Sequence, residues 1–159
     1  METEWPPMER RGPVIDESTV TAFEHSIGHR LPDDYRRFLL EVNGGDPADS
    51  NRRAPFGLLN RFFSLADPDD DMSLETANSF PEPPSPELLC IGADGTGTAV
   101  FVVIAGGRRG QVWTLDTENP RPVGSNPRVL WHDRRDMEKV ADSFAEFVRQ
   151  LGPLQLAGV

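Results

Sequence analysis

The sequence predicts a single α+β domain, in which a mostly antiparallel or mixed β-sheet is flanked by N-terminal helices and a C-terminal helix. Apolar residues recur at helical spacing near both ends of the chain, and short apolar runs between Gly-rich or Pro-rich turns fill the region between them. A length of 159 residues suits one domain with a sizeable core. Because strands lie between terminal helices and do not alternate with them, a doubly wound parallel sheet is disfavoured.

The first helix is predicted to start at Asp16, whose carboxylate suits an N-cap. Its apolar stripe consists of Val20, Phe23 and Ile27, and Gly28 is expected to end it. Before it, residues 1–13 contain three prolines and mixed charges, and we expect a flexible N-terminal arm there.

The second helix is predicted to start at Pro32, since proline is favoured in the first helical position. Asp33 and Asp34 then lie at the positive end of the helix dipole. The core-facing stripe follows at spacings of three and four, and Asn43-Gly44-Gly45 ends the helix. The stripe residues are Tyr35, Phe38, Leu39 and Val42.

The rest of the chain is predicted to be mostly sheet. Residues 98–105 include a run that is apolar on both faces, which is typical of a central, covered strand. A short helix is predicted over 73–78 and an extended Pro-rich segment over 81–86. The predicted strands are 56–65, 88–92, 98–105, 111–116 and 128–132, and a final helix is predicted over 136–151.

Several of these motifs together resemble the SUKH superfamily, whose domains are also called Smi/Knr-like. The N-terminal part of the pattern is Phe23-Glu24, Gly28, Leu31-Pro32, an aromatic helix and Asn43-Gly44-Gly45. Residues 89–97 resemble the family's strand and glycine turn, and 141–147 its closing helix. Thr98 departs from the pattern, because an acidic residue is frequent at that position in the family.

The resemblance implies a SUKH domain over residues 14–152, followed by a short tail over 153–159. It also implies a small cytosolic binding protein, and the sequence itself disfavours an enzyme, because it shows no nucleophile with a base and a group to orient them. Bacterial members commonly act as immunity proteins that neutralise a toxin domain, often a nuclease, whereas fungal members suggest a regulatory or scaffold module. Fifteen arginines against one lysine are typical of a GC-rich bacterial source.

The acidic charge is concentrated in the middle of the chain. The net charge is −10, and residues 41–99 alone hold 11 acidic and three basic side chains. Such a surface disfavours nucleic acids and anionic membranes and favours a basic protein partner. We therefore predict a partner-binding surface that is formed by Asp46, Asp49, Asp67, Asp69, Asp70, Asp71 and Glu75. A surface that only maintains solubility is the alternative.

Phe56, Phe80 and Trp113 are possible apolar anchors of this surface, and each is equally compatible with the core. Cys90 is the only cysteine and lies in an apolar run, so we expect an inert core thiol. One cysteine, an acidic start and the absence of a long apolar run favour the cytoplasm.

Three motifs suggest chemistry but fit it poorly, and we expect no cofactor and no metal. His25 and His29 have metal-ligand spacing, but His25 points away from the buried stripe, and two solvated histidines explain the pattern better. An EF-hand loop starting at Asp67 would need glycine and glutamate where Met72 and Asn78 stand.

The glycines of residues 92–97 lack the order of a nucleotide loop, so we predict a tight turn between strands. The segment 81–86 holds two P-x-x-P spacings, for which a rigid entry into the next strand is the simpler interpretation.

Overall fold

The structure is a computed structural model that describes residues 5–48, 53–54, 57–79, 83–94, 97–116, 130–134 and 136–151. The helices within these ranges are α1 (Glu17–Ile27), α2 (Asp33–Glu41), α3 (Leu74–Ala77), α4 (Phe144–Arg149) and the 3₁₀ turn η2 (Trp131–Asp133). The strands are β1 (Met8–Arg11), β2 (Gly45–Pro47), β3 (Arg53–Ala54), β4 (Gly57–Phe62), β5 (Leu88–Asp94), β6 (Thr98–Val103), β7 (Val112–Asp116) and β8 (Met137–Ala141).

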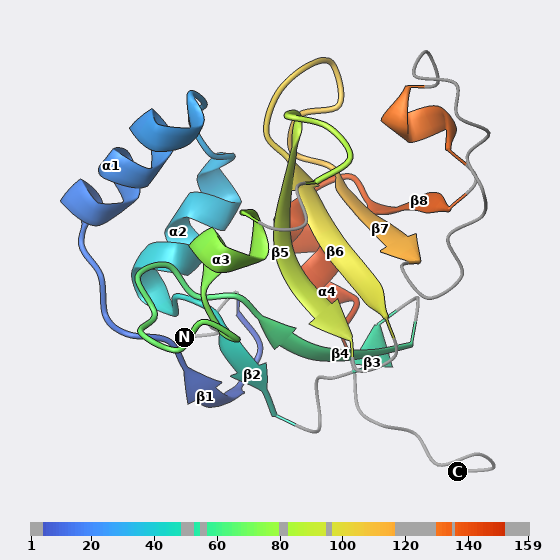
Figure 1. The fold of residues 1–159 in the computed structure, drawn as a ribbon. Coiled ribbons are helices and arrows are strands. Elements are labelled where there is room, and N and C mark those ends of the chain that lie inside the picture. Colours follow the sequence, from blue (N-terminus) through green and yellow to red (C-terminus); the bar gives the residue numbers. More distant parts are fainter. Residues whose placement is uncertain are drawn as a thin grey trace, which may run out of the picture.

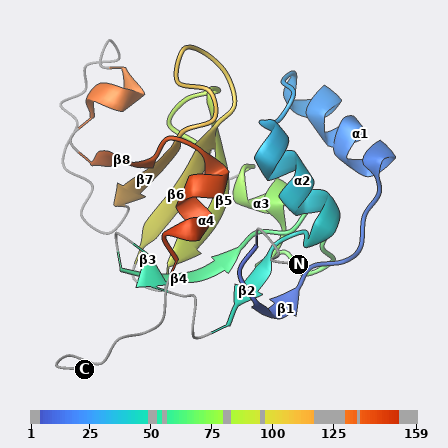
Figure 2. The same cartoon turned by 180° about the vertical axis from the view of Figure 1, so that it is seen from behind.

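These strands form one antiparallel sheet in the order β1-β2-β4-β5-β6-β7-β8, and β3 adds to β4 (Figure 1). Helix α4 crosses the face of the sheet that Figure 2 shows, and α2 and α1 lie beside it on the same side. The predicted α+β architecture is therefore confirmed, with a sheet flanked by the N-terminal helices and by a C-terminal helix.

Alternation along the central strands divides the core between the two faces of the sheet. Leu89 and Ile91 of β5 join the main core under the helices, whereas Leu88 and Cys90 join a second cluster on the opposite face. Strand β6 divides in the same way, and Val100 to Ile104 are all buried. The prediction of a covered central strand is thus confirmed.

The main core is rich in aromatic rings. Phe38 of α2 lies 5.0 Å from both Phe62 of β4 and Phe144 of α4, measured between ring centroids. Trp5 packs 5.3 Å from Phe38, and the guanidinium of Arg37 lies 5.4 Å from the Trp5 ring. These edge-to-face and tilted contacts connect α2, α4 and the sheet.

Trp5 packs on α2 and α4, so the segment around it lies against the domain. Met8–Arg11 pair with β2, so the described part of the segment predicted as a flexible arm is integrated into the sheet. The sequence pattern could not show this, because a four-residue edge strand and a single tryptophan depend on partners that lie far along the chain. The domain boundaries stay a prediction, and residues 152–159 lie outside the described ranges.

The helix predicted over 136–151 is wrong in its first part. Residues Met137–Ala141 form strand β8 and pair with β7, and only Phe144–Arg149 are helical. Ser143 caps this shorter helix by accepting the Glu146 N–H at 3.0 Å, and Glu146 accepts the Asp142 N–H at 3.1 Å. The Ser143 cap marks the true start of the helix.

The strand predicted over 128–132 is also wrong at its end, because Trp131–Asp133 form the 3₁₀ turn η2. Residues 128 and 129 lie outside the described ranges. None of the helices that the structure describes combines the length and apolarity needed to cross a bilayer.

Candidate functional site

The acidic loop, residues 67–71, connects the end of β4 with α3 (Figure 1). Asp69, Asp70 and Asp71 are exposed and Asp67 is partly buried. The Asp67 carboxylate accepts the Asp69 N–H at 2.9 Å, and the Asp69 carboxylate accepts the Asp71 N–H at 3.0 Å. These local bonds form successive Asx turns, so the loop has a defined conformation.

The two ends of the acidic loop are joined to each other by hydrogen bonds. Ser64 accepts the Leu74 N–H and donates its own N–H to Met72, each at 2.8 Å. Glu75 in the first turn of α3 accepts the Ala66 N–H at 3.1 and 3.2 Å. Ala66 has a φ of 59°, a conformation that this bond helps to hold. Hydrogen bonds between the two flanking segments therefore hold the ends of the loop in place.

The structure places five of the seven predicted partner-binding residues in this one segment: Asp67, Asp69, Asp70, Asp71 and Glu75. Asp46 lies elsewhere, on β2 between β1 and β4, and its buried Oδ1 has no hydrogen-bond partner. Asp49 lies outside the described residues. The acidic loop with Glu75 is therefore the part of the prediction that forms a continuous candidate surface.

Of the three possible anchors, Trp113 belongs to the core. Its side chain is buried in the second cluster, its ring lies 4.9 Å from that of Trp131, and its Nε1 donates to Gln111 at 2.9 Å. Phe56 and Phe80 lie outside the described residues. His132 is half-buried beside the same cluster, 5.2 Å from the Trp131 ring.

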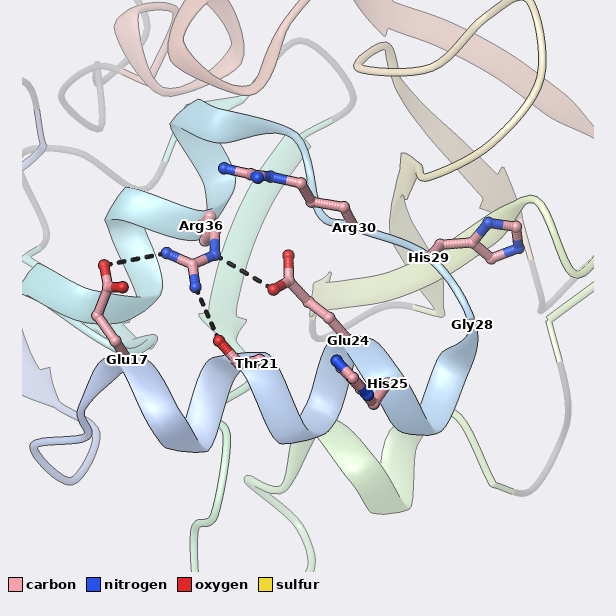
Figure 3. A pocket seen from close by; sticks show the side chains of 8 residues that line it. All are labelled: Glu17, Thr21, Glu24, His25, Gly28, His29, Arg30 and Arg36. Carbon is pink, nitrogen blue, oxygen red and sulfur yellow. Dashed lines mark hydrogen bonds and ion pairs between the residues drawn. The ribbon is translucent and has the colours of Figure 1, made fainter.

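A polar hollow of about 710 Å³ lies between α1 and α2 (Figure 3). Arg36 of α2 stands at its centre and donates to Glu24, Glu17 and Thr21 at 3.3, 3.2 and 3.2 Å. The second oxygen of Glu24 accepts the Leu31 N–H at 2.8 Å. Each oxygen of this buried carboxylate is thus used within the protein.

This pairing neutralises the strongest charges of the hollow. Partial burial lowers the pKa of Arg36, but hydrogen bonds to Glu17 and Glu24 outweigh it and leave that pKa above its ordinary value. The guanidinium therefore stays charged and cross-links α1 to α2.

His25 and His29 line the same hollow on either side of Gly28, and Figure 3 shows their rings directed away from each other. His25 is exposed, as its position on the helix predicts. No group of three or more possible metal ligands occurs within the described ranges.

Asn43 is buried and connects the end of α2 to two distant segments, whereas the sequence pattern marks it only as part of a helix stop. Its amide donates to the carbonyls of Pro13 and Leu65, and its oxygen accepts the Leu65 N–H, all at 2.8 Å. Its φ of 56° is one that asparagine tolerates. The polar residue of each motif, Glu24 in Phe-Glu and Asn43 in Asn-Gly-Gly, is therefore buried and bonded within the fold. Both motifs have a structural role.

Cys90 and Tyr35 are both buried in the core. Burial raises the pKa of the Cys90 thiol to about 12 and also raises the pKa of Tyr35. The tight turn predicted over residues 92–97 is too long at its start, because Gly92 to Asp94 belong to strand β5, and residues 95 and 96 lie outside the described residues. Asp94 accepts the Thr98 N–H at 2.7 Å, and Gly97 has a φ of 102°.

The structure is thus a small α+β domain with an exposed acidic loop and a sheet that is covered by apolar side chains on both faces. Residues 14–150 match the model of the SMI1 / KNR4 family (SUKH-1), and the chain belongs to that family. No curated protein matches the chain significantly.

Proposed function

We propose that this chain is a cytoplasmic, non-catalytic immunity protein that binds and neutralises a cognate bacterial toxin domain. The observation that carries the proposal is the acidic loop, in a domain whose family includes immunity proteins. Its exposed carboxylates at Asp69, Asp70 and Asp71 form no ion pair within the described part of the chain, in contrast to the paired charges around Arg36. They are available to a basic partner.

The mechanism is electrostatic and steric. A toxin nuclease needs a basic groove for its nucleic-acid substrate, and an acidic surface complements such a groove. Long-range attraction raises the rate of association, and desolvated contacts formed afterwards determine how slowly the complex dissociates. A loop that is already folded loses little conformational entropy on binding, which favours affinity.

The alternative is a regulatory or scaffold module of the Smi/Knr type, which would bind a housekeeping protein. The two functions are separated by identifying the partner. The full chain serves as bait in lysates of the source organism, at low and at high salt. Capture of one basic toxin domain that the chain inactivates supports immunity, and capture of a housekeeping complex instead contradicts it.

With that toxin in hand, the acidic loop is tested by Asp69→Asn, Asp70→Asn and Asp71→Asn together. Asparagine keeps an oxygen that can accept the Asp71 N–H, so the loop conformation is preserved. We expect association to slow about tenfold at low salt and its salt dependence to weaken, as stopped-flow kinetics would measure.

The matched control is Asp133→Asn, Glu138→Gln and Asp142→Asn, three exposed acids around η2 and β8. This variant changes the net charge by the same amount. Any difference in association rate between the two triple variants is therefore due to the position of the charges and not to the net charge. If both triple variants slow association equally, the loop is not the contact surface.

A further inference from the structure

The N-terminal strap, residues 5–11, lies along the outer edge of β2 (Figure 1). Three positions of the strap pair with β2, and a bulge interrupts the pairing between Met8 and Arg10. The Ala48 N–H also donates to the Pro7 carbonyl at 2.9 Å. The strap lies outside residues 14–150, which match the family model. It therefore adds a strand at the edge of the part of the chain that defines the family.

An aromatic side chain anchors the strap at its start. Trp5 is 7% exposed, and its ring centroid lies 5.3 Å from that of Phe38 and 5.9 Å from that of Phe144. The Arg37 guanidinium lies 5.4 Å from the same ring. The side chains of residues 9–11, in contrast, are exposed. Burial at one end of the strap must therefore offset the conformational entropy that all seven of its residues lose on ordering.

The strap site consists of the free edge of β2 and the rings around Trp5, and it accepts a backbone at close range. A Cβ added to Gly45 would clash with the Arg10 carbonyl oxygen, and one added to Gly12 would clash with the Asn43 carbonyl oxygen. Gly45 also has a φ of 108°. The last glycine of the Asn-Gly-Gly motif therefore leaves room for a strand at the edge of β2.

Two buried polar atoms next to the strap lack a hydrogen-bond partner among the described residues. The Oγ of Ser64 is fully buried and faces Gly12, because a Cβ added to that glycine would clash with it. The Oδ1 of Asp46 has no partner either, although Arg10 lies opposite Asp46 in the sheet. Buried polar atoms are normally bonded, so the strap satisfies its own site incompletely. A segment that supplies donors at these two points would fit the site better.

We propose that the strap site is a docking site for an extended, basic segment of a protein partner that carries an aromatic side chain, and that the strap fills this site in the free chain. The partner's backbone pairs with β2, and its aromatic side chain takes the place of Trp5. A donor from the partner binds the free oxygen of Asp46. This site is separate from the acidic loop and does not depend on the proposed function.

The charge of the protein decides between the possible occupants. The net charge of −10 attracts a basic segment, and the strap itself carries Arg10 and Arg11 at this edge. A second copy of the chain fits less well, because two copies of the same strongly acidic protein repel each other. An acidic segment is disfavoured for the same reason.

The probe is a capped peptide with the sequence of residues 5–12, because the strap shows which residues fit the site. The tethered strap competes with it at an effective concentration of roughly millimolar. The ¹⁵N-labelled full chain therefore carries Trp5→Ala, which removes the anchor of the strap. We expect saturable amide shifts by NMR at Phe38, Gly45 and Asp46, and binding about tenfold tighter than to the wild-type chain.

The matched control is Val14→Ala, which lies close to the strap in the chain but alters a side chain that is 97% exposed. It should bind the peptide as weakly as the wild-type chain does. A peptide with alanine in place of tryptophan should bind the Trp5→Ala chain about tenfold more weakly than the original peptide. A peptide with glutamates in place of its two arginines should show a similar loss.

A second measurement leaves Trp5 in place and does not depend on the folding of Trp5→Ala. Met8→Cys with Pro47→Cys puts two thiols at opposite positions of an antiparallel pair, a separation that a disulfide can span. Oxidation then locks the strap onto β2, while the native Cys90 is buried and does not compete. We expect no peptide binding to the oxidised full chain, and weak binding like that of the wild type after reduction.

Absence of saturable shifts in the Trp5→Ala chain at millimolar peptide overturns the proposal, and so does equal binding by the oxidised and reduced double-cysteine chains. Equal binding of the alanine peptide, or of the glutamate peptide, overturns it as well, because the aromatic anchor or the basic charge is then not recognised. Dimerisation of the Trp5→Ala chain in place of peptide binding, measured by light scattering, would reassign the site to a second copy of the chain.

Discussion

The hollow between α1 and α2 and the acidic loop are both rich in charge, but they use it in opposite ways. In the hollow, Glu24 and Glu17 surround Arg36, and each ion pair joins two helices. In the loop, the carboxylates of Asp67 and Asp69 bond only to nearby backbone N–H groups, and those of Asp70 and Asp71 point to solvent without an ion pair in the described structure.

This difference separates stability from recognition. Charges that are paired inside a fold are costly to remove singly and are not available to a ligand, whereas solvated charges contribute little to stability and remain available. Glu24, which belongs to the family pattern, is of the first kind, and the neutral amide of Asn43 is likewise used within the fold. A motif can therefore identify a fold without marking the surface that performs the function.

The largest effect is expected at the Asn43 junction, which tests the stabilising side of the comparison. Asn43→Ala removes three hydrogen bonds and leaves the Pro13 carbonyl and both backbone groups of Leu65 without this partner. We expect a loss of about 3 kcal/mol in the free energy of unfolding, measured by urea denaturation.

Asn43→Gly is the control for backbone conformation, because glycine adopts the φ of 56° without strain. It should recover at most about 1 kcal/mol relative to alanine. A loss below about 1 kcal/mol in Asn43→Ala would show that the junction is not a stabilising element.

The next effect tests the comparison directly. Glu24→Ala removes a buried carboxylate that binds Arg36 and the Leu31 N–H, and should cost about 2 kcal/mol. Asp70→Ala in the acidic loop removes an exposed carboxylate without a bond and should change stability by less than about 0.5 kcal/mol. Thermal unfolding of both variants measures the contrast, and similar losses at the two positions would break it.

The smallest effect extends the comparison to a third paired carboxylate. Asp136 accepts two bonds from Arg134 at 2.9 and 2.7 Å, and its side chain is 2% exposed. The Arg134 hydrogen bonds outweigh the effect of burial and hold the pKa of Asp136 below its ordinary value of 3.8.

A lowered pKa in the folded state means that this carboxylate contributes stability above about pH 4, and the contribution is lost as the pH falls through the folded pKa. Asp136→Asn should lower stability by about 1 kcal/mol at pH 7 and flatten the acid limb of the stability profile. Asp133→Asn, an exposed neighbour, should leave that limb unchanged. A retained acid limb in Asp136→Asn would assign it to other groups.

The parts of the fold that could be predicted have local causes. Asp16 caps α1 through the Thr19 N–H at 3.0 Å, and Gly28 ends it with a φ of 76°, both within reach of the pattern. The position of the acidic loop was also predictable, because a run of aspartates cannot be buried without partners. Its Asx turns and its attachment through Glu75 were not predicted, since they depend on geometry.

The wrong and missed elements have distant causes. Met137 and Val140 fit a helical stripe and a strand about equally well. The segment is a strand because the edge of β7 offers hydrogen-bonding partners to its backbone. Trp5 gave no local signal, yet it packs on α2 and α4.

By itself, the sequence determined the N-terminal helices with their caps, the covered strands and the family pattern, because these depend on neighbours within a few residues. The tertiary structure alone decided that Met137–Ala141 join the sheet, that Arg36 neutralises Glu24, and that Arg109 is held against Arg30. Each of these needs two segments to meet in space, and burial and hydrogen bonding between distant segments override local preference.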